Sequence, residues 1–536
     1  MIIERLFMNK NQIKLFTLIS SGVGTIIGSG WLFGSAHAAA LAGPASIISW
    51  IIGAVIILII SLSLIELSTI SPIRMGSIGY YLRYTHGSFA SFIAEWTILI
   101  GYISTVPSEA TASTQYLSNW DFAWTKALFD TQTHSLTTNG LIVSSILCIF
   151  YFLINYYSLS FLAKSIKTIT IFKMVVPLIV IFSFYLISHY SGGKNYDIST
   201  NNFTPYGISG IFTAITTAGI IYAFNGFQSP ISFAAESENP RRNVPIAIIA
   251  SILFCAAIYS LLQYSYITVM PMQLISKHGW SGLHFASPFA NLAIALNLNL
   301  IAMLLYIDAF VSPAGAGIIY NSVTARIMYG MSDHMPKIIG IRSSSSGIPT
   351  GALIVILPLS FMCLWLLPSW DKLAAVISVG YILGYASATV CAISFRRIAP
   401  NKLHDKAIRI PGMRIFAPLG FILVTYMLYW SRWPLNGQVI FVVLLGLPIY
   451  FYYAKKRNTL DINDILKAVW IIAYLLTVAL FAYLGSKSFG GINVFPDIID
   501  HIVLIFISLF FFTWGTRVSH KTTAYILEIE NNINTL

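Results

Sequence analysis

Long apolar stretches separated by short polar connections run through almost the whole chain. A helix needs about 20 apolar residues to cross a bilayer, so the pattern predicts up to fourteen membrane-spanning helices. They are expected at 15–41, 44–70, 89–117, 140–157, 166–189, 208–235, 244–269, 298–330, 350–367, 373–395, 416–430, 437–454, 466–485 and 501–515. Because two of these segments, 416–430 and 501–515, are short, the count lies between twelve and fourteen. The pattern is that of an all-α polytopic membrane protein.

Glycine interrupts the first and the sixth of these segments at matching places. The first reads Gly22-Val23-Gly24-Thr25-Ile26-Ile27-Gly28-Ser29-Gly30-Trp31, and the second reads Tyr222-Ala223-Phe224-Asn225-Gly226-Phe227-Gln228-Ser229-Pro230. Glycine and proline are poor helix formers, and unwound backbone at membrane depth needs protein or a water-filled cavity to satisfy it. Such a pair of breaks in two halves of a chain is typical of the substrate site of a secondary transporter.

Composition and charge agree with a membrane protein and set its orientation. The 536 residues are 57% hydrophobic and 9% charged, against about 25% charged residues in soluble proteins. With the N-terminus in the cytoplasm, 25 Lys and Arg residues fall on the inner side, and six on the outer side: Lys126, Lys194, Lys277, Lys372, Arg432 and Lys487. This asymmetry obeys the positive-inside rule. It accounts for the net charge of +12 without a nucleic-acid partner, and it predicts cytoplasmic N- and C-termini in the cell (inner or plasma) membrane.

The two breaks divide the chain into two halves of five spans. Because five is odd, the second half must run in the opposite orientation to the first. The expected organisation is a cytoplasmic N-terminus (1–14), a first five-helix repeat (15–189), a second, inverted repeat (208–396), additional C-terminal membrane helices (416–515) and a cytoplasmic tail (516–536). In the outer stretch 271–297, Ser287-Pro288-Phe289 is expected to begin a short helix.

Four motifs between residues 15 and 400 carry a family resemblance. They are Gly28-Ser29-Gly30, Phe224-Asn225-Gly226-Phe227 followed by 236–245, the stretch 72–96 with Gly76, Tyr80 and Gly87, and the stretch 321–336 with Arg326, Tyr329 and Met335-Pro336. Together they resemble the amino acid–polyamine–organocation permeases, and Ser29-Gly30-Trp31-Leu32-Phe33 is most similar to their aspartate–proton symporter group. The resemblance implies amino acid transport and the inverted five-plus-five helix fold shared with sodium-coupled amino acid transporters (the LeuT-like fold).

Three positions depart from that family pattern. Gln228 stands where many relatives have glutamate, Glu95 precedes Trp96 where glycine is common, and Asn225 stands where the family often has an apolar residue. These positions bear on substrate choice and ion coupling, so the resemblance does not transfer a specificity to this chain.

The unwound backbone supplies the predicted substrate site. At the first break, carboxylate binding at a helix N-terminus is expected from four backbone N–H groups, those of Ile27, Gly28, Ser29 and Gly30, with the Ser29 hydroxyl as a further donor. The substrate's α-ammonium is expected to bind unwound carbonyls near Gly24, Thr25, Ile26, Tyr222, Ala223 and Asn225, with Gly226 completing the second break. The resemblance implies the same division. The alternative is close helix packing through Gly24-x-x-x-Gly28.

Side chains at the breaks are candidates for gating and specificity. Tyr222 and Phe224 are expected to line or gate the pocket, against ordinary core or lipid contact. Asn225 is a candidate for recognising a polar substrate side chain, and its alternative role is to hold the unwound turn together. Glu66 and Glu236, at the inner ends of their spans, are expected to anchor cytoplasmic gates by pairing with arginines.

Three ionisable residues inside the spans are candidates for proton coupling, because buried charges are costly. The resemblance places Lys173 at the family's helix-5 lysine, near the unwound part of the first helix, where its ammonium would replace a sodium ion or exchange a proton. Its alternative is snorkelling to the interface. Asp308, near mid-depth, and Glu109, in the outer half of its span, are candidates for a proton carrier or a partner of a cationic substrate. Either could instead be a protonated carboxyl that bonds a neighbouring helix. His37 is expected to be structural.

These observations predict a permease that moves amino acids by alternating access with proton symport. An exchanger without net ion coupling is the alternative, and a channel or a transporter-like sensor is the alternative outside transport. We expect no enzyme, metal or cofactor, since the chain holds no His-Glu-x-x-His or Gly-x-Ser-x-Gly motif and its four cysteines have no metal spacing. The expected partners are an amino acid, protons and the lipid bilayer. A homodimer is left open because late spans often form dimer surfaces in relatives.

Overall fold

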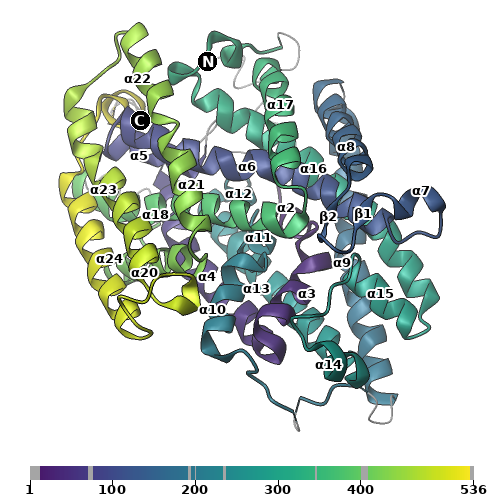
Figure 1. Ribbon diagram of the computed structural model, residues 1–536. Coiled ribbons are helices and arrows are strands. Elements are labelled where there is room, and N and C mark those ends of the chain that lie inside the picture. The colour runs from purple at the N-terminus through teal and green to yellow at the C-terminus, as the bar shows by residue number, and fades with distance from the viewer. Residues whose placement is uncertain are drawn as a thin grey trace.

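Every segment expected to span the membrane is helical in the computed structural model, which describes residues 13–70, 77–157, 159–190, 195–198, 201–232, 237–343, 347–399 and 408–530 (Figure 1). The main helices are α2 (Leu15–Ile26), α3 (Gly30–Ala42), α4 (Ser46–Ile70), α6 (Ser88–Leu117), α8 (Thr138–Tyr157), α9 (Leu159–Tyr190), α10 (Gly207–Thr217), α11 (Ile220–Phe224), α12 (Ser229–Ser232), α13 (Pro240–Thr268), α16 (Asn299–Gly330), α17 (Thr350–Leu366), α18 (Trp370–Ile398), α20 (Met413–Trp430), α21 (Leu435–Leu444), α22 (Leu447–Lys456), α23 (Ile462–Leu484) and α24 (Ile499–Val518).

The connections carry short elements. They are η1 (Gly43–Ala45), η2 (Ile78–Tyr80), α5 (Tyr81–Thr85), α7 (Ala123–Lys126), α14 (Met272–His278), α15 (Pro288–Ala295), η4 (Ser332–His334), η5 (Lys337–Gly340), η6 (Lys487–Phe489), α25 (Thr523–Tyr525) and η7 (Ile526–Glu530). Among the described residues the only sheet is the antiparallel hairpin of β1 (Phe129–Asp130) and β2 (Ser135–Leu136). The helix predicted to begin at Ser287-Pro288 is confirmed as α15.

Length and hydropathy confirm the polytopic membrane class. Within the described chain, 11 helices are long and apolar enough to cross a membrane, or up to 12 if the bent sixth segment is one span. One of the 11 runs over Gly30–Ile70 and so contains both α3 and α4, and two shorter apolar helices are Leu15–Ile26 and Thr350–Leu366. The marked ends of the chain both lie toward the top of Figure 1.

Both predicted breaks are present, and the sixth segment has one more. Residues 27–29 separate α2 from α3, and residues 225–228 separate α11 from α12. An additional break lies at Gly219, which has a left-handed φ of +83°. The parts on either side of it, Gly207–Thr217 and Ile220–Ile231, are bent by 46°. The second broken segment therefore has two joints where the sequence predicted one.

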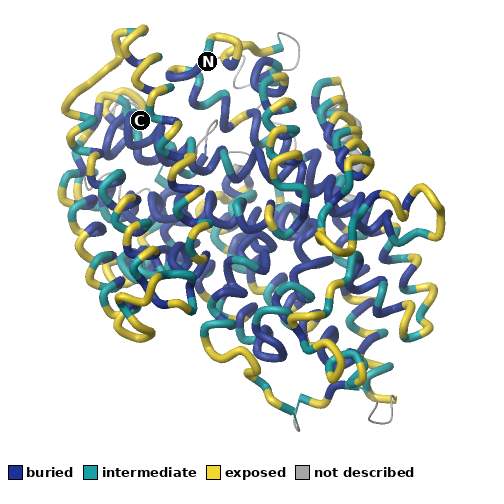
Figure 2. The backbone as a smooth tube through the Cα atoms, in the orientation of Figure 1, coloured by how far each residue is buried: buried dark blue, intermediate teal, exposed yellow. Residues whose placement is uncertain are grey.

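Helix α6 forms the centre of the packing. It packs against α8, α16, α17 and α18, while α2 and α3 pack against α13, and α2 also contacts α9. Helix α20 packs on α4 and α18, and α24 packs on α18 and α20, so the C-terminal helices cover one side of the bundle. Figure 2 shows the buried backbone concentrated in the middle of the molecule. The division into two inverted repeats stays a prediction.

Candidate substrate and proton site

A buried carboxyl group from α6 lies directly against the first break. Glu109 Oε2 accepts a hydrogen bond from the backbone N–H of Ser29 at 3.0 Å. Glu109 Oε1 accepts a second one from the hydroxyl of Tyr222, on α11, at 2.7 Å. A Cβ atom at position 28 would lie only 2.7 Å from Glu109 Oε1, so this approach needs glycine there. The first break, α6 and α11 therefore converge on one carboxyl group.

Hydroxyl groups extend this contact to a network over four segments. The Ser29 Oγ lies 3.0 Å from the Tyr222 hydroxyl, which also accepts a hydrogen bond from Ser108 at 3.1 Å. The indole N–H of Trp370, at the start of α18, donates to Ser29 Oγ at 2.9 Å. The Trp370 ring stacks on Phe33 with centroids 4.9 Å apart. An aromatic layer thus lies beside the carboxyl group.

The two breaks touch each other. Gly226 has a φ of +103°, and a Cβ atom there would lie 2.7 Å from Thr25 Cγ2 and 2.9 Å from the Thr25 carbonyl carbon. A Cβ atom on Gly30 would likewise lie 2.7 Å from Ala223 Cβ. Glycine at both places lets the unwound segments approach within van der Waals contact.

The predicted acceptor carbonyls are partly engaged by the protein. The Tyr259 hydroxyl, from α13, lies 3.2 Å from both the Ile26 and the Ala223 carbonyl oxygens. The Tyr222 carbonyl accepts from the backbone N–H of Asn225 at 3.0 Å. One predicted donor is wrong, because the Ile27 N–H completes the last turn of α2 by donating to the Val23 carbonyl at 2.9 Å. Of the predicted donors, the Ile27 N–H thus belongs to α2 and the Ser29 N–H is held by Glu109.

A narrow cavity joins most of the predicted substrate residues. It is lined by Thr25, Ile26, Gly28, Gly30, Glu109, Tyr222, Ala223 and Tyr320. The side chains meet so closely that the cavity does not admit a water molecule, so the site is closed in this conformation. Phe224 is absent from the lining; it is fully buried, and its ring packs against Trp50 and Tyr259 at centroid distances of 6.0 and 5.5 Å.

Lys173 contacts α2 close to the first break. Its Nζ donates to the carbonyl of Gly24 at 3.4 Å, and the residue is only 1% exposed. The amine therefore stays inside the protein and does not snorkel. It interacts electrostatically with both Glu109 and Asp308. Asp308, on α16, accepts from the hydroxyl of Ser312 at 2.6 Å, and its other carboxyl oxygen, Oδ2, is buried without a hydrogen-bond partner among the described residues. All three ionisable candidates thus form one group.

The second break carries uncharged polar side chains. Asn225 Nδ2 donates to the Tyr320 hydroxyl at 3.0 Å, and Gln228 Nε2 donates to the Tyr102 hydroxyl at 2.9 Å. Gln228 Nε2 also lies 3.2 Å from Asn225 Oδ1, which accepts from the Tyr385 hydroxyl at 3.5 Å. Asn225 and Gln228 are thus bonded to each other within the turn, and both roles expected for Asn225 stay predictions.

Comparison with known proteins decides the family. The amino acid permease family model matches residues 13–453. This chain belongs to the amino acid permease family. The permease is 42% identical over 512 residues to the glutamate/serine transporter AimA of Bacillus subtilis, covering 95% of this chain and 94% of that protein. It is 34% identical over 515 residues to the aspartate–proton symporter of the same organism (94% and 96% covered) and 23% identical over 470 residues to its branched-chain amino acid permease BcaP (84% and 95% covered).

The comparisons confirm three predictions: the superfamily, the multi-pass membrane fold, and a secondary transporter of amino acids in place of an enzyme. The predicted side of the termini and the homodimer stay predictions.

The structure describes two of the three remaining candidates, Glu66 and His37. Glu66 forms two charge-assisted bonds of 2.6 Å with Arg396 and accepts from the Ile410 N–H at 3.0 Å. It is therefore paired with an arginine, and its role in a gate stays a prediction. Glu236 lies outside the described residues. The His37 ring stacks on Trp370 at 5.5 Å.

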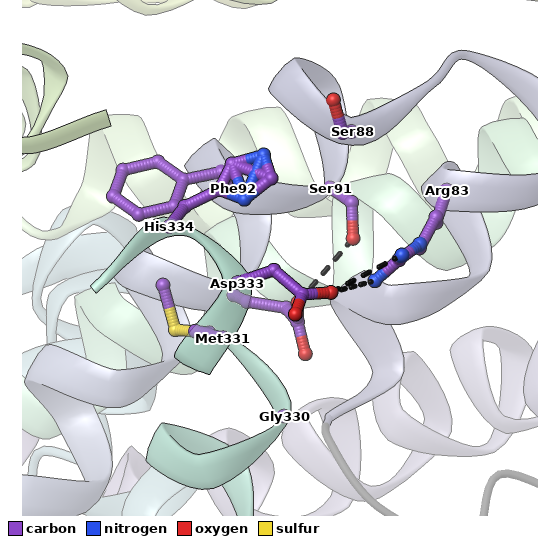
Figure 3. Close-up of a pocket in the computed structure, with 9 residues that line it drawn as sticks. Arg83, Ser88, Ser91, Phe92, Gly330, Met331, Asp333 and His334 are labelled. Atoms are coloured by element: carbon purple, nitrogen blue, oxygen red, sulfur yellow. Dashed lines mark hydrogen bonds and ion pairs between the residues drawn. The ribbon is translucent and has the colours of Figure 1, made fainter. Parts of the chain in front are cut away.

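A second cavity lies on the side predicted to be cytoplasmic, between α5, the start of α6 and η4 (Figure 3). Arg83 and Asp333 form an ion pair of 3.4 Å across it. Glu95, which departs from the family pattern, accepts from the Ser91 hydroxyl at 3.3 Å and from the Ser77 N–H at 3.2 Å. Burial lowers the pKa of His334 to about 4, so its imidazole is neutral at physiological pH. Glu95 therefore belongs to this inner cavity and not to the breaks.

The sequence reasoning missed the aromatic partners of the site. Trp370, Tyr320 and Tyr259 each contact a break. Nothing local marks them, because the chain holds 12 Trp and 29 Tyr residues spread over many spans. A tyrosine or tryptophan in the middle of a predicted span is the only sequence signal that would have pointed to these partners, and that signal is weak.

Proposed function

We propose that this permease is an amino acid–proton symporter in which Glu109 carries the coupling proton. The observation that supports this is the bond from the Ser29 N–H to Glu109. The N-terminus of α3 is the predicted site for the substrate's α-carboxylate, and a carboxyl group of the protein itself already holds one of its donors. Substrate and Glu109 therefore compete for the same place.

A proton resolves this competition. Two ionised carboxylates within hydrogen-bond reach of one donor repel each other, and such a pair normally keeps one proton. Protonated Glu109 no longer needs the Ser29 N–H, and its own O–H is able to donate to the incoming carboxylate. Proton binding and substrate binding then favour each other reciprocally. One relative is named an aspartate–proton symporter, which supports coupling of this kind.

The charge balance supports one proton per cycle. The group around the first break holds one amine, Lys173, and two carboxyls, Glu109 and Asp308. With all three ionised the buried group is negative, and one proton makes it neutral, which is far less costly inside a membrane. Glu109 is the better carrier because it lines the cavity, whereas Asp308 does not.

The breaks supply the moving parts. We infer that the two predicted repeats, 15–189 and 208–396, move against each other around the closed cavity, with the unwound residues and the additional joint at Gly219 as hinges. The α-ammonium of the substrate would bind the carbonyls near Thr25. Substrate favours closure only by the difference in its affinity for the open and closed states. The Lys and Arg distribution supports cytoplasmic termini.

The test is transport by the purified permease in proteoliposomes with the membrane potential clamped at zero. We would use labelled serine and labelled glutamate, named for a relative of this chain. An inward gradient of one pH unit supports at most about tenfold accumulation at one proton per substrate. Glu109→Gln keeps the shape and bonding capacity of the side chain and loses the titration. We expect it to abolish accumulation while exchange between internal and external substrate continues.

Glu95→Gln is the matched control, since Glu95 is a second buried carboxyl on α6 that bonds Ser91 and Ser77 away from the breaks. It should accumulate substrate like the wild type. Accumulation that persists in Glu109→Gln would refute the role of Glu109. Wild-type uptake that requires internal substrate, whatever the gradient, would make the permease an exchanger. Ion current without solute uptake would indicate a channel.

A further inference from the structure

The second break is surrounded by a shell of polar groups that carry no charge. Its members are Asn225, Gln228, Tyr102, Tyr320 and Tyr385, from the break, α6, α16 and α18 (Figure 1). Asn225 is 1% exposed, and the three tyrosines are buried as well. Among the described residues, no Lys, Arg, Asp or Glu side chain forms a hydrogen bond to this shell. Buried polar groups of this kind are costly unless they are all satisfied.

One atom of the shell lacks a partner. Gln228 Oε1 is buried and accepts no hydrogen bond from any described residue, although the Nε2 of the same amide bonds both Tyr102 and Asn225. A buried amide oxygen left in this way is destabilising, and each such group calls for an explanation. A donor supplied from outside the protein would satisfy it.

The shell is continuous with the closed cavity. Tyr320 both lines the cavity that holds Glu109 and accepts the hydrogen bond of Asn225. An amino acid whose carboxylate lies at the first break would therefore direct its side chain past Tyr320 toward Asn225 and Gln228. This placement rests on the proposed function.

We propose that these five residues form a side-chain subsite that selects uncharged groups able both to donate and to accept hydrogen bonds. Hydroxyl and carboxamide side chains fit this chemistry: their O–H or N–H donates to Gln228 Oε1, and their oxygen accepts from the tyrosine hydroxyls. A carboxyl side chain fits only in its protonated form, because it then presents the same donor and acceptor pair.

Other side chains are excluded for separate reasons. An apolar side chain leaves the Gln228 oxygen unpaired in a closed site, and sites built to hydrogen-bond a substrate strongly reject analogues that lack the group. A carboxylate finds no cation there: the Lys173 ammonium donates to Gly24, and the Glu109 carboxyl interacts electrostatically with Tyr320. Tyr102, Tyr320 and Tyr385 are the titratable groups that face the subsite from α6, α16 and α18. An ammonium side chain lacks an acceptor for the hydroxyl donors.

The experiment is competition against labelled serine in counterflow, which needs no proton gradient. Competitors are glutamine, alanine, leucine, lysine and glutamate, at pH 5 and pH 7.5. We expect glutamine to compete at least about tenfold better than alanine or leucine, the scale of one lost hydrogen bond in a closed site. The apparent affinity of glutamate, relative to that of glutamine, should rise by about tenfold for each unit by which the pH is lowered. The reason is that the neutral fraction of a carboxyl of pKa about 4.3 changes by that factor.

Two variants locate the selection. Gln228→Leu keeps the approximate size of the side chain, and Tyr320→Phe removes one hydroxyl. In both variants the ratio of the competing affinities of glutamine and leucine should fall toward one. Tyr474→Phe is the control, since it deletes a buried hydroxyl that bonds Thr425 in the C-terminal helices; its preference should equal that of the wild type.

The proposal is overturned if serine is not exchanged, if leucine competes like glutamine in the wild type, or if glutamate competes equally at both pH values. The wild-type panel decides even where a variant does not fold. Because counterflow is independent of coupling, failure of Glu109 as proton carrier leaves this readout intact. Conversely, loss of selectivity leaves gradient-driven accumulation unaffected.

Discussion

Gly226→Ala tests whether the contact between the two breaks is needed for binding. The change adds one methyl group at a residue with φ of +103°. That methyl carbon would lie 2.7 Å from Thr25 Cγ2, 2.9 Å from the Thr25 carbonyl carbon and 3.0 Å from its oxygen. Since two of these atoms are backbone, the overlap is relieved only if the first break moves away from the second.

The cost has two parts. A left-handed backbone costs a residue with a Cβ atom about 1–2 kcal/mol. Overpacking against neighbours that cannot rotate away costs about 1–3 kcal/mol more. Gly207→Ala separates these parts, because Gly207 has a φ of +70° in the same broken segment and no neighbouring atom lies within 4 Å of the place that its methyl carbon would take. The second part alone corresponds to a loss of about 5- to 150-fold in substrate affinity.

The assay is the counterflow KM of both variants for one labelled amino acid, with the amount of folded protein checked by size-exclusion chromatography. Gly226→Ala should raise the KM by at least about fivefold over Gly207→Ala, which should bind like the wild type. Equal KM values for the two variants would refute the reasoning. The breaks would then not be in contact in the conformation that binds substrate.

Three further substitutions have defined outcomes. Glu66→Gln breaks a largely buried pair with Arg396 (2.6 Å) and should cost about 3 kcal/mol, seen as a lower unfolding temperature in detergent; an unchanged temperature would contradict this. Trp370→Phe deletes the indole N–H that donates to Ser29 Oγ. The loss of that hydrogen bond costs about 1 kcal/mol and should raise the counterflow KM about fivefold. An unaltered KM would show that this bond is absent when substrate is bound. Asp308→Asn should weaken gradient-driven accumulation while exchange continues, because without the Asp308 charge the Lys173–Glu109 pair is neutral before Glu109 takes up a proton; unchanged accumulation would contradict the charge balance proposed above.

The sequence alone determined the membrane class, the helical segments and the main breaks. Apolar runs of about 20 residues have no other stable form in a bilayer, because only a helix satisfies their backbone within one segment. The four glycines between 22 and 30, and the combination of Asn225, Gly226 and Pro230, marked the unwound places, because several poor helix formers together weaken a helix. Such local effects are visible in the order of residues. The joint at Gly219, with its φ of +83°, was missed because a single glycine in an apolar helix is common.

Tertiary structure alone decided which carboxyl lies at the break. Glu95 and Glu109 are on the same helix, and both are buried. One bonds Ser77 and Ser91 beside the inner cavity, while the other bonds Ser29 and Tyr222. Their own neighbours in the chain do not distinguish them. Glu95 and Glu109 stand 14 residues apart, which places them about 21 Å apart along α6 on nearly the same face. What each carboxyl meets depends on which segments cross α6 at its depth, and that is set by side chains far apart in sequence.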